Sequence, residues 1–190
     1  MTWYRERLRH SRDAWRAEQA GAGIEITPPP PPTRTELART KRKGIARWIE
    51  LVADGDQDAT ETVLETTGKP RKIKDLDELL FALGEAGVAL HADIKDDATL
   101  AAQIDALGSA RGLDEFECPA SPPAGPARCT ALLRAWDSWL AERGVRLVAI
   151  DGDDDAWHAV VVRDAWLDEL RALAGELAIP LREPADLYAD

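Results

Sequence analysis

Two apolar runs separated by a short acidic stretch constrain the fold of this chain most strongly. The runs are VRLVAID, residues 145–151, and AWHAVVV, residues 156–162, with four residues between them. Both are rich in β-branched and aliphatic residues, which favours strands. Because so short a loop can join antiparallel strands but not parallel ones, the sequence predicts an antiparallel hairpin with DGDDD, residues 151–155, at its turn.

The rest of the chain shows mainly helical spacing of apolar residues. We expect helices at 34–53, 58–67, 75–86, 97–107, 126–143 and 164–177, a strand at 88–94 and an edge strand within the tail at 178–188. This order predicts an α/β (α+β) domain. Its small mixed sheet of three to four strands would include the C-terminal hairpin and pack against several helices.

Five consecutive prolines at positions 28–32 divide the chain. Such a run is excluded from helix interiors and central strands and extends as polyproline II. We therefore predict two parts, a basic amphipathic arm with a polyproline linker over residues 1–32 and a single acidic domain over residues 33–190. In the arm, Trp3, Tyr4, Leu8 and Trp15 lie along one face of a predicted helix.

The charge of the chain is unevenly distributed. The net charge is -11, but residues 1–47 carry 11 basic and 5 acidic residues, whereas residues 48–190 carry 13 and 30. A body this acidic repels phosphate backbones, so we expect no nucleic acid as its partner. It complements a basic protein surface instead. The sequence has neither an apolar run long enough to span a membrane nor a signal peptide, which predicts a cytoplasmic protein.

Two acidic segments share the alternating aspartates with which calcium-binding loops begin. They are DGDDD at 151–155 and DGDQDA at 54–59. An EF-hand needs glycine at the sixth position, where these segments have Ala156 and Ala59. We therefore interpret the first as a hairpin turn and the second as a junction between two helices, with Asp58 as the N-cap of the second helix. Asp97 is expected to cap the helix at 97–107 in the same way.

Histidines on two predicted strands are the best candidates for chemistry. His91 and Asp93 alternate with apolar residues and share one face of strand 88–94, and His158 lies on the face opposite to Trp157. If the two strands are neighbours, these side chains converge with Asp151 and form a set able to bind a metal ion or transfer protons. The alternative to a metal-binding or proton-transfer site is that these side chains form an ordinary polar surface without a chemical role.

Other chemistry has no support in the sequence. Motifs for phosphate-binding loops, dinucleotide folds, serine hydrolases and zinc proteases are absent, so no cofactor is indicated. Cys118 and Cys129 are too few for a disulfide framework, and we interpret them as packing residues.

Three segments resemble a bacterial domain family of unknown function. They are HADIKDD at 91–97, VAIDGDDDAWHAVVV at 148–162 and LAGELAIPL at 173–181. The family combines an acidic D-x-K-D-D strand end with a C-terminal I-D-x-D-x-D-x-[WY] hairpin, and the resemblance covers about residues 45–182. It implies no catalytic residues.

These observations predict a non-enzymatic protein-interaction domain, such as an immunity (antitoxin-like) or adaptor protein, whose acidic face binds a basic partner. The expected contact residues are Asp54, Asp56, Asp151, Asp153, Asp154, Asp155 and the anchor Trp157.

Two alternatives stay open. One is a divalent-metal-dependent enzyme or metal-binding module that uses His91, Asp93, Asp151, Asp153 and His158. The other is peripheral docking of the basic N-terminal arm on a membrane or a partner.

Overall fold

The computed structural model describes residues 34–68, 76–117 and 124–182. The chain divides into two units at residue 40, and of the first unit the structure describes only Arg34–Thr40, the start of α2. The described helices are α2 (Arg34–Val52), α3 (Gln57–Thr66), α4 (Leu76–Glu85), α5 (Asp97–Ala110), α6 (Pro126–Ala141) and α7 (Leu167–Leu177), the last preceded by the 3-10 turn η1 (Asp164–Trp166).

Four strands form one sheet in the order β1-β3-β2-β4, and every pairing is antiparallel. They are β1 (Ala89–Asp93), β2 (Val145–Ile150), β3 (Ala156–Arg163) and β4 (Leu181–Arg182). The predicted α+β class is confirmed, as is the hairpin of β2 and β3 with DGDDD at its turn. The sheet is antiparallel throughout where a small mixed sheet was expected.

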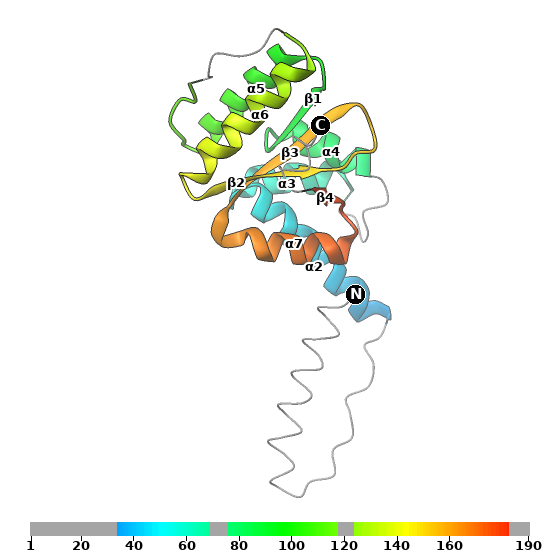
Figure 1. Cartoon of the computed structure of the whole chain (residues 1–190). Coiled ribbons are helices and arrows are strands. Elements are labelled where there is room, and N and C mark those ends of the chain that lie inside the picture. The colour runs from blue at the N-terminus through cyan, green and yellow to red at the C-terminus, as the bar shows by residue number, and fades with distance from the viewer. Residues whose placement is uncertain (1–33, 69–75, 118–123, 183–190) are drawn as a thin grey trace, which may run out of the picture. The chain divides into compact units, whose positions relative to one another are not determined.

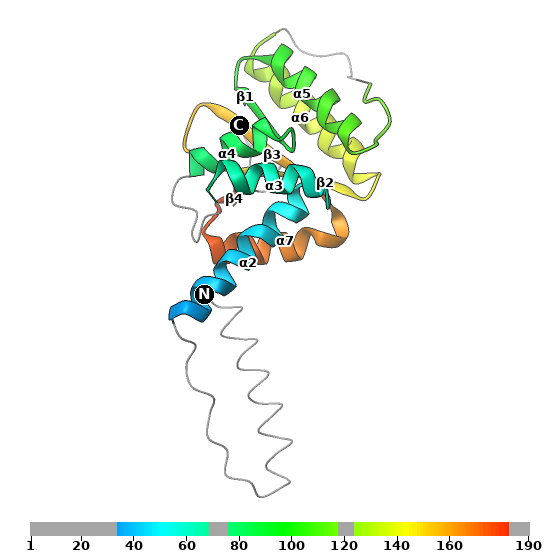
Figure 2. The same ribbon diagram turned by 180° about the vertical axis from the view of Figure 1, so that it is seen from behind.

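Helices cover both faces of the sheet (Figures 1 and 2). Val160 and Val162 of β3 pack with α2, α4 and α7, whereas Ala159 and Val161 pack with α5 and α6. Residues 159–162 are all buried because β3 is central and neither of its faces meets water. This explains why the strand reads as a continuous apolar run rather than as an alternating one.

Two predicted N-caps are wrong. Asp56, not Asp58, caps α3, since its Oδ1 accepts the N–H of Ala59 at 3.1 Å. Asp96, not Asp97, caps α5, since its Oδ1 accepts the N–H of Thr99 at 2.9 Å. In both cases the predicted residue lies in the first turn, where its negative charge still favours the helix dipole.

The remaining boundaries differ by a few residues from the prediction. Helix α5 continues to Ala110, α6 ends at Ala141, and the described part of the tail contributes β4. Cys129 is buried in the core, as expected of a packing residue. Cys118 and the predicted arm at 1–32 lie outside the described residues. None of the helices in the described ranges combines the length and the apolar character needed to cross a membrane.

Ile49 of α2 provides a direct test of the larger core. Its side chain is fully buried, and Ile49→Ala should lower the free energy of unfolding by about 2–5 kcal/mol through lost burial and the cavity left behind. Phe81→Ala removes an apolar side chain that is 62% exposed and should change the free energy of unfolding by less than about 0.5 kcal/mol. Urea denaturation measures both. Equal losses in the two variants would contradict this assignment of the core.

Candidate functional site

The pairing of β1 with β3 places His91 directly opposite His158. The backbone N–H of His91 donates to Oε1 of Gln103 at 2.7 Å, and its carbonyl accepts from Nε2 of the same side chain at 2.6 Å. Both backbone groups thus point away from β3, so the histidines form a non-hydrogen-bonded pair, the kind in which opposed side chains lie closest. Their Nδ1 atoms are 3.1 Å apart and their ring centroids 4.7 Å apart.

Gln103 of α5 takes the place of a neighbouring strand at this edge. Its amide offers one donor and one acceptor, which match the free N–H and C=O of His91. An uncovered edge strand exposes such groups to other chains, and covering them is a common way to block aggregation. The same contact fixes the backbone from which the His91 side chain extends.

Asp154, in the hairpin turn, holds the second histidine from the other side. Its Oδ1 and Oδ2 lie 2.9 and 3.0 Å from Nε2 of His158. Burial raises the pKa of Asp154, but the hydrogen bonds that its carboxylate accepts from His158 and from the backbone N–H of Ala156 oppose this shift, and the pKa lies below its usual value. Because an ionised carboxylate only accepts hydrogen bonds, Nε2 of His158 carries a proton. Asp154, His158 and His91 therefore form one connected row.

Gly152 makes room for this row. A Cβ atom at this position would lie 2.7 Å from both Cδ2 and Nε2 of His158 and 2.9 Å from Oδ1 of Asp154. His158 is 5% exposed and is the one buried polar or charged residue in the described part of the chain, so its ring has little freedom to move away. The close approach of the turn backbone to the imidazole thus requires glycine.

A cavity of about 520 Å³ lies beside the row. Helix α4 contributes Leu80, Phe81 and Gly84 to its wall, and Phe81 is 62% exposed. Of the described residues that line the cavity, three carry a carboxylate and none is lysine or arginine. The residues that line it are Asp77, Leu80, Phe81, Gly84, Glu85, Gly87, Ala89, His91, Gln103, Ala106, Leu107, Asp154 and His158.

The structure brings together only two of the five residues in the predicted metal set, His91 and His158. The Asp93 carboxylate accepts the N–H of Lys95 at 2.8 Å, Asp151 pairs with Arg182, and Asp153 is exposed. Among the described residues, no group of three or more histidine, cysteine, aspartate and glutamate side chains is arranged to hold a metal ion. The aspartate that contacts His158 is Asp154, which was predicted only as a partner contact, and not Asp151 or Asp153 of the predicted metal set.

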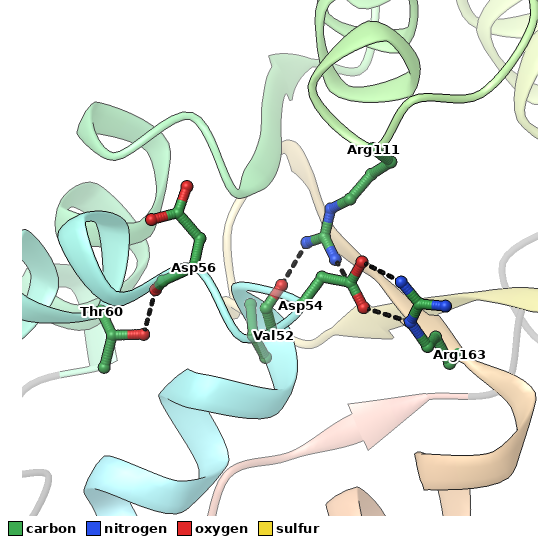
Figure 3. A network of polar contacts seen from close by, with 6 residues as sticks. All are labelled: Val52, Asp54, Asp56, Thr60, Arg111 and Arg163. Atoms are coloured by element: carbon green, nitrogen blue, oxygen red, sulfur yellow. Dashed lines mark hydrogen bonds and ion pairs between the residues drawn. The ribbon is translucent and has the colours of Figure 1, made fainter.

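Asp54, another predicted partner contact, forms ion pairs within the chain (Figure 3). Its carboxylate accepts from Nε and Nη2 of Arg163 at 2.6 and 2.8 Å, and Nη1 of Arg111 lies 4.0 Å away. The Arg111 guanidinium also donates to the carbonyl oxygen of Val52. Desolvation lowers the pKa of Arg111, and the charge of Asp54 opposes this shift. Asp54 thereby joins the ends of α2, α5 and β3.

Other predicted contact residues also have structural roles. Asp56 caps α3, and its carbonyl oxygen accepts the hydroxyl of Thr60 at 2.6 Å (Figure 3). The Trp157 side chain is half-buried and packs against the core cluster that includes residues of α5 and α6. Asp153 and Asp155 remain exposed at the hairpin turn.

Gly152→Ala should disturb the histidine row. We expect a loss of about 1–3 kcal/mol in unfolding free energy from overpacking, together with shifted imidazole resonances of His158 in NMR spectra. Gly175→Ala is the matched control, because a Cβ atom at that helical position meets nothing within 4 Å. It should stabilise α7 by up to about 1 kcal/mol. A Gly152→Ala variant as stable as the wild type, with unshifted His158 signals, would rule out the close approach.

Asp54→Ala should lower the unfolding free energy by about 1–3 kcal/mol, because it removes charged hydrogen bonds and leaves Arg111, 8% exposed, without its carboxylate. Asp153→Ala controls for backbone strain, since φ is 58° at Asp54 and 55° at Asp153. Asp153 lies in an exposed turn, so its substitution should cost only the backbone contribution. Thermal and urea denaturation compare the two. Equal losses would mean that the ion pairs contribute nothing.

Comparison with known proteins gives the chain a family. A family model described as a domain of unknown function, DUF6630, matches residues 44–184. The match covers nearly the same residues as the resemblance noted above. No curated protein and no solved structure matches the chain significantly. The match spans most of the chain and all four strands, so the chain belongs to the DUF6630 family.

Proposed function

We propose that this protein is an interaction domain that binds a basic surface of another protein through the exposed face of α4. We define the α4 face as Asp77, Glu78, Phe81 and Glu85, all of which are exposed. The observation that supports the proposal best is Phe81, which is 62% exposed and is the one exposed large hydrophobic side chain among the described residues.

The spacing of these residues makes the α4 face continuous. Asp77, Phe81 and Glu85 follow one another at intervals of four, so they form one stripe along the helix, and Glu78 lies beside it. Covering an aromatic side chain of this size is worth about 1.5–3 kcal/mol. A central aromatic residue within a polar rim is the usual arrangement of an interaction hot spot.

The charge of the α4 face selects the partner. Three of its four residues are acidic, and residues 48–190 carry 30 acidic against 13 basic residues. Opposed charge accelerates encounter and disfavours acidic competitors. We therefore propose a partner that presents lysine or arginine around an apolar pocket for Phe81.

This proposal keeps the predicted kind of function but moves the contact residues. Asp54, Asp56, Asp151 and Asp154 form contacts within the chain, and their use by a partner would disrupt the ion pairs and the helix cap described above. An immunity or adaptor role, a bacterial origin and the hairpin motif as a family signature stay predictions. So does docking by the N-terminal arm, which lies outside the described residues.

Site-specific cross-linking tests the α4 face. With the full chain carrying a photoreactive phenylalanine analogue in place of Phe81, we expect one basic protein of the host to be cross-linked in a yield that falls as salt is raised. The same analogue in place of Glu176, exposed on α7, is the matched control and should not capture it. Chelator is present throughout, so bound metal plays no part.

Three results would contradict the proposal. The first is equal capture from positions 81 and 176. The second is capture of a second copy of this chain from position 81, which would make the α4 face a self-association surface. The third is a cross-linked partner whose free form binds the Phe81→Ala variant as tightly as the wild type.

A further inference from the structure

We propose that Nδ1 of His91 and Nδ1 of His158 together bind one divalent transition-metal ion of the zinc, nickel or copper class, whose remaining positions are open to the cavity. This site lies on β1 and β3 and does not depend on the partner proposed for the α4 face.

The separation of the two nitrogens fits a shared ion. Metal–imidazole bonds are about 2.0–2.1 Å long, so two nitrogens on one metal lie roughly 2.9–3.4 Å apart for angles between right and tetrahedral. The two Nδ1 atoms lie 3.1 Å apart. An N–H···N hydrogen bond has a similar length, so the two arrangements differ in whether a proton or a metal ion joins the rings.

Asp154 prepares His158 for such a role. Its carboxylate holds Nε2 of His158 at 2.9 and 3.0 Å, which places the ring proton on Nε2 and leaves the lone pair on Nδ1. Histidines that bind metals usually donate their other N–H to a carboxylate or carbonyl in this way. The His158 side chain is only 3% exposed, so its orientation is fixed before any ligand arrives.

His91 is held by its backbone rather than by its ring. Both of its backbone polar groups bond to Gln103, at 2.7 and 2.6 Å, while its side chain is exposed and lines the cavity. The strand pairing then sets the distance between the two rings. An ion that enters from the cavity meets two nitrogen atoms already close together.

The electrostatic surroundings favour a cation. Asp77, Glu85 and Asp154 line the cavity, and among the described residues that line it none is lysine or arginine. Carboxylates close to an ion offset the cost of moving its charge away from bulk water. The cavity of about 520 Å³ has room for the water molecules that would complete the coordination of the ion.

The ligand type restricts the choice of metal. Imidazole suits zinc, copper and nickel, whereas calcium and magnesium prefer several oxygen ligands. The described part of the chain contains no group of three or more candidate ligands, so its contribution to the site is the two nitrogens. Such a site is open, as catalytic metal sites are, rather than closed like structural ones.

The experiment is a metal titration of the full chain, purified with chelator and then freed of it. Calorimetry with zinc chloride should give one site per chain, and magnesium or calcium chloride should give none. Long-range ¹H–¹⁵N NMR of the imidazoles should show that zinc shifts the Nδ1 signals of His91 and His158 while Nε2 of His158 remains protonated.

Three variants locate the site. His91→Ala should weaken zinc binding at least about tenfold, and it alters an exposed side chain, so the fold should persist. Asp154→Asn should weaken binding by about 10–100-fold, although Asp154 touches no metal, because it orients His158. His10→Ala removes the third histidine of the chain and should leave the affinity unchanged.

Absence of zinc binding by the wild type would overturn the proposal, since only a proton would then join the rings. Binding that survives His91→Ala, or is lost in His10→Ala, would also overturn it, as would metallation at Nε2 of His158. Because the cross-linking at position 81 is performed in chelator, a negative metal result leaves that proposal standing, and a negative cross-linking result leaves this one standing.

Discussion

The antiparallel pairing of β1 with β3 is the contact on which both the fold and the site depend. It brings residues 89–93 against residues 156–160, far along the chain, and makes β3 a central strand buried on both faces. It also sets His91 opposite His158 in a non-hydrogen-bonded position. A register shift by one residue would turn each side chain to the other face and separate the two rings. Packing of the apolar residues of β3 thus determines the position of the polar ones.

The acidic residues of this chain divide between structural and surface roles. Asp54 closes an ion pair with Arg163 near the Arg111 guanidinium, Asp56 and Asp96 cap helices, and Asp151 pairs with Arg182. Asp54 and Asp151 are half-buried, and their ion pairs offset the cost of that burial, whereas Asp56 and Asp96 are exposed. The α4 face presents exposed carboxylates around an exposed phenylalanine. Net charge alone therefore says little about which carboxylates a partner can reach.

At the β1 edge of the sheet, the backbone polar groups of His91 are covered while its side chain stays accessible from the cavity. Gln103 covers the backbone of β1 as another strand would, while the side chain of His91 faces the cavity beside it. The row from Asp154 through His158 to His91 connects the hairpin turn to this cavity. The turn backbone at Gly152 approaches the imidazole of His158 so closely that a Cβ atom there would lie 2.7 Å from the ring. The polar groups are thus held by neighbouring backbone and packing rather than by one another alone.

Local patterns in the sequence determined the elements of this protein, and tertiary structure decided what they bring together. The helices, the hairpin and its acidic turn follow from interactions between near neighbours, such as apolar periodicity and loop length, so the sequence was sufficient for them. The adjacency of β1 and β3 depends on the packing of the whole sheet, so the pairing of His91 with His158 could not be predicted from the sequence. The contact of His158 with Asp154, rather than with Asp151 or Asp153, depends on the backbone path of the turn, in which Asp153 has a φ of 55°. The ion pair of Asp54 likewise joins segments 109 residues apart, which no local pattern encodes.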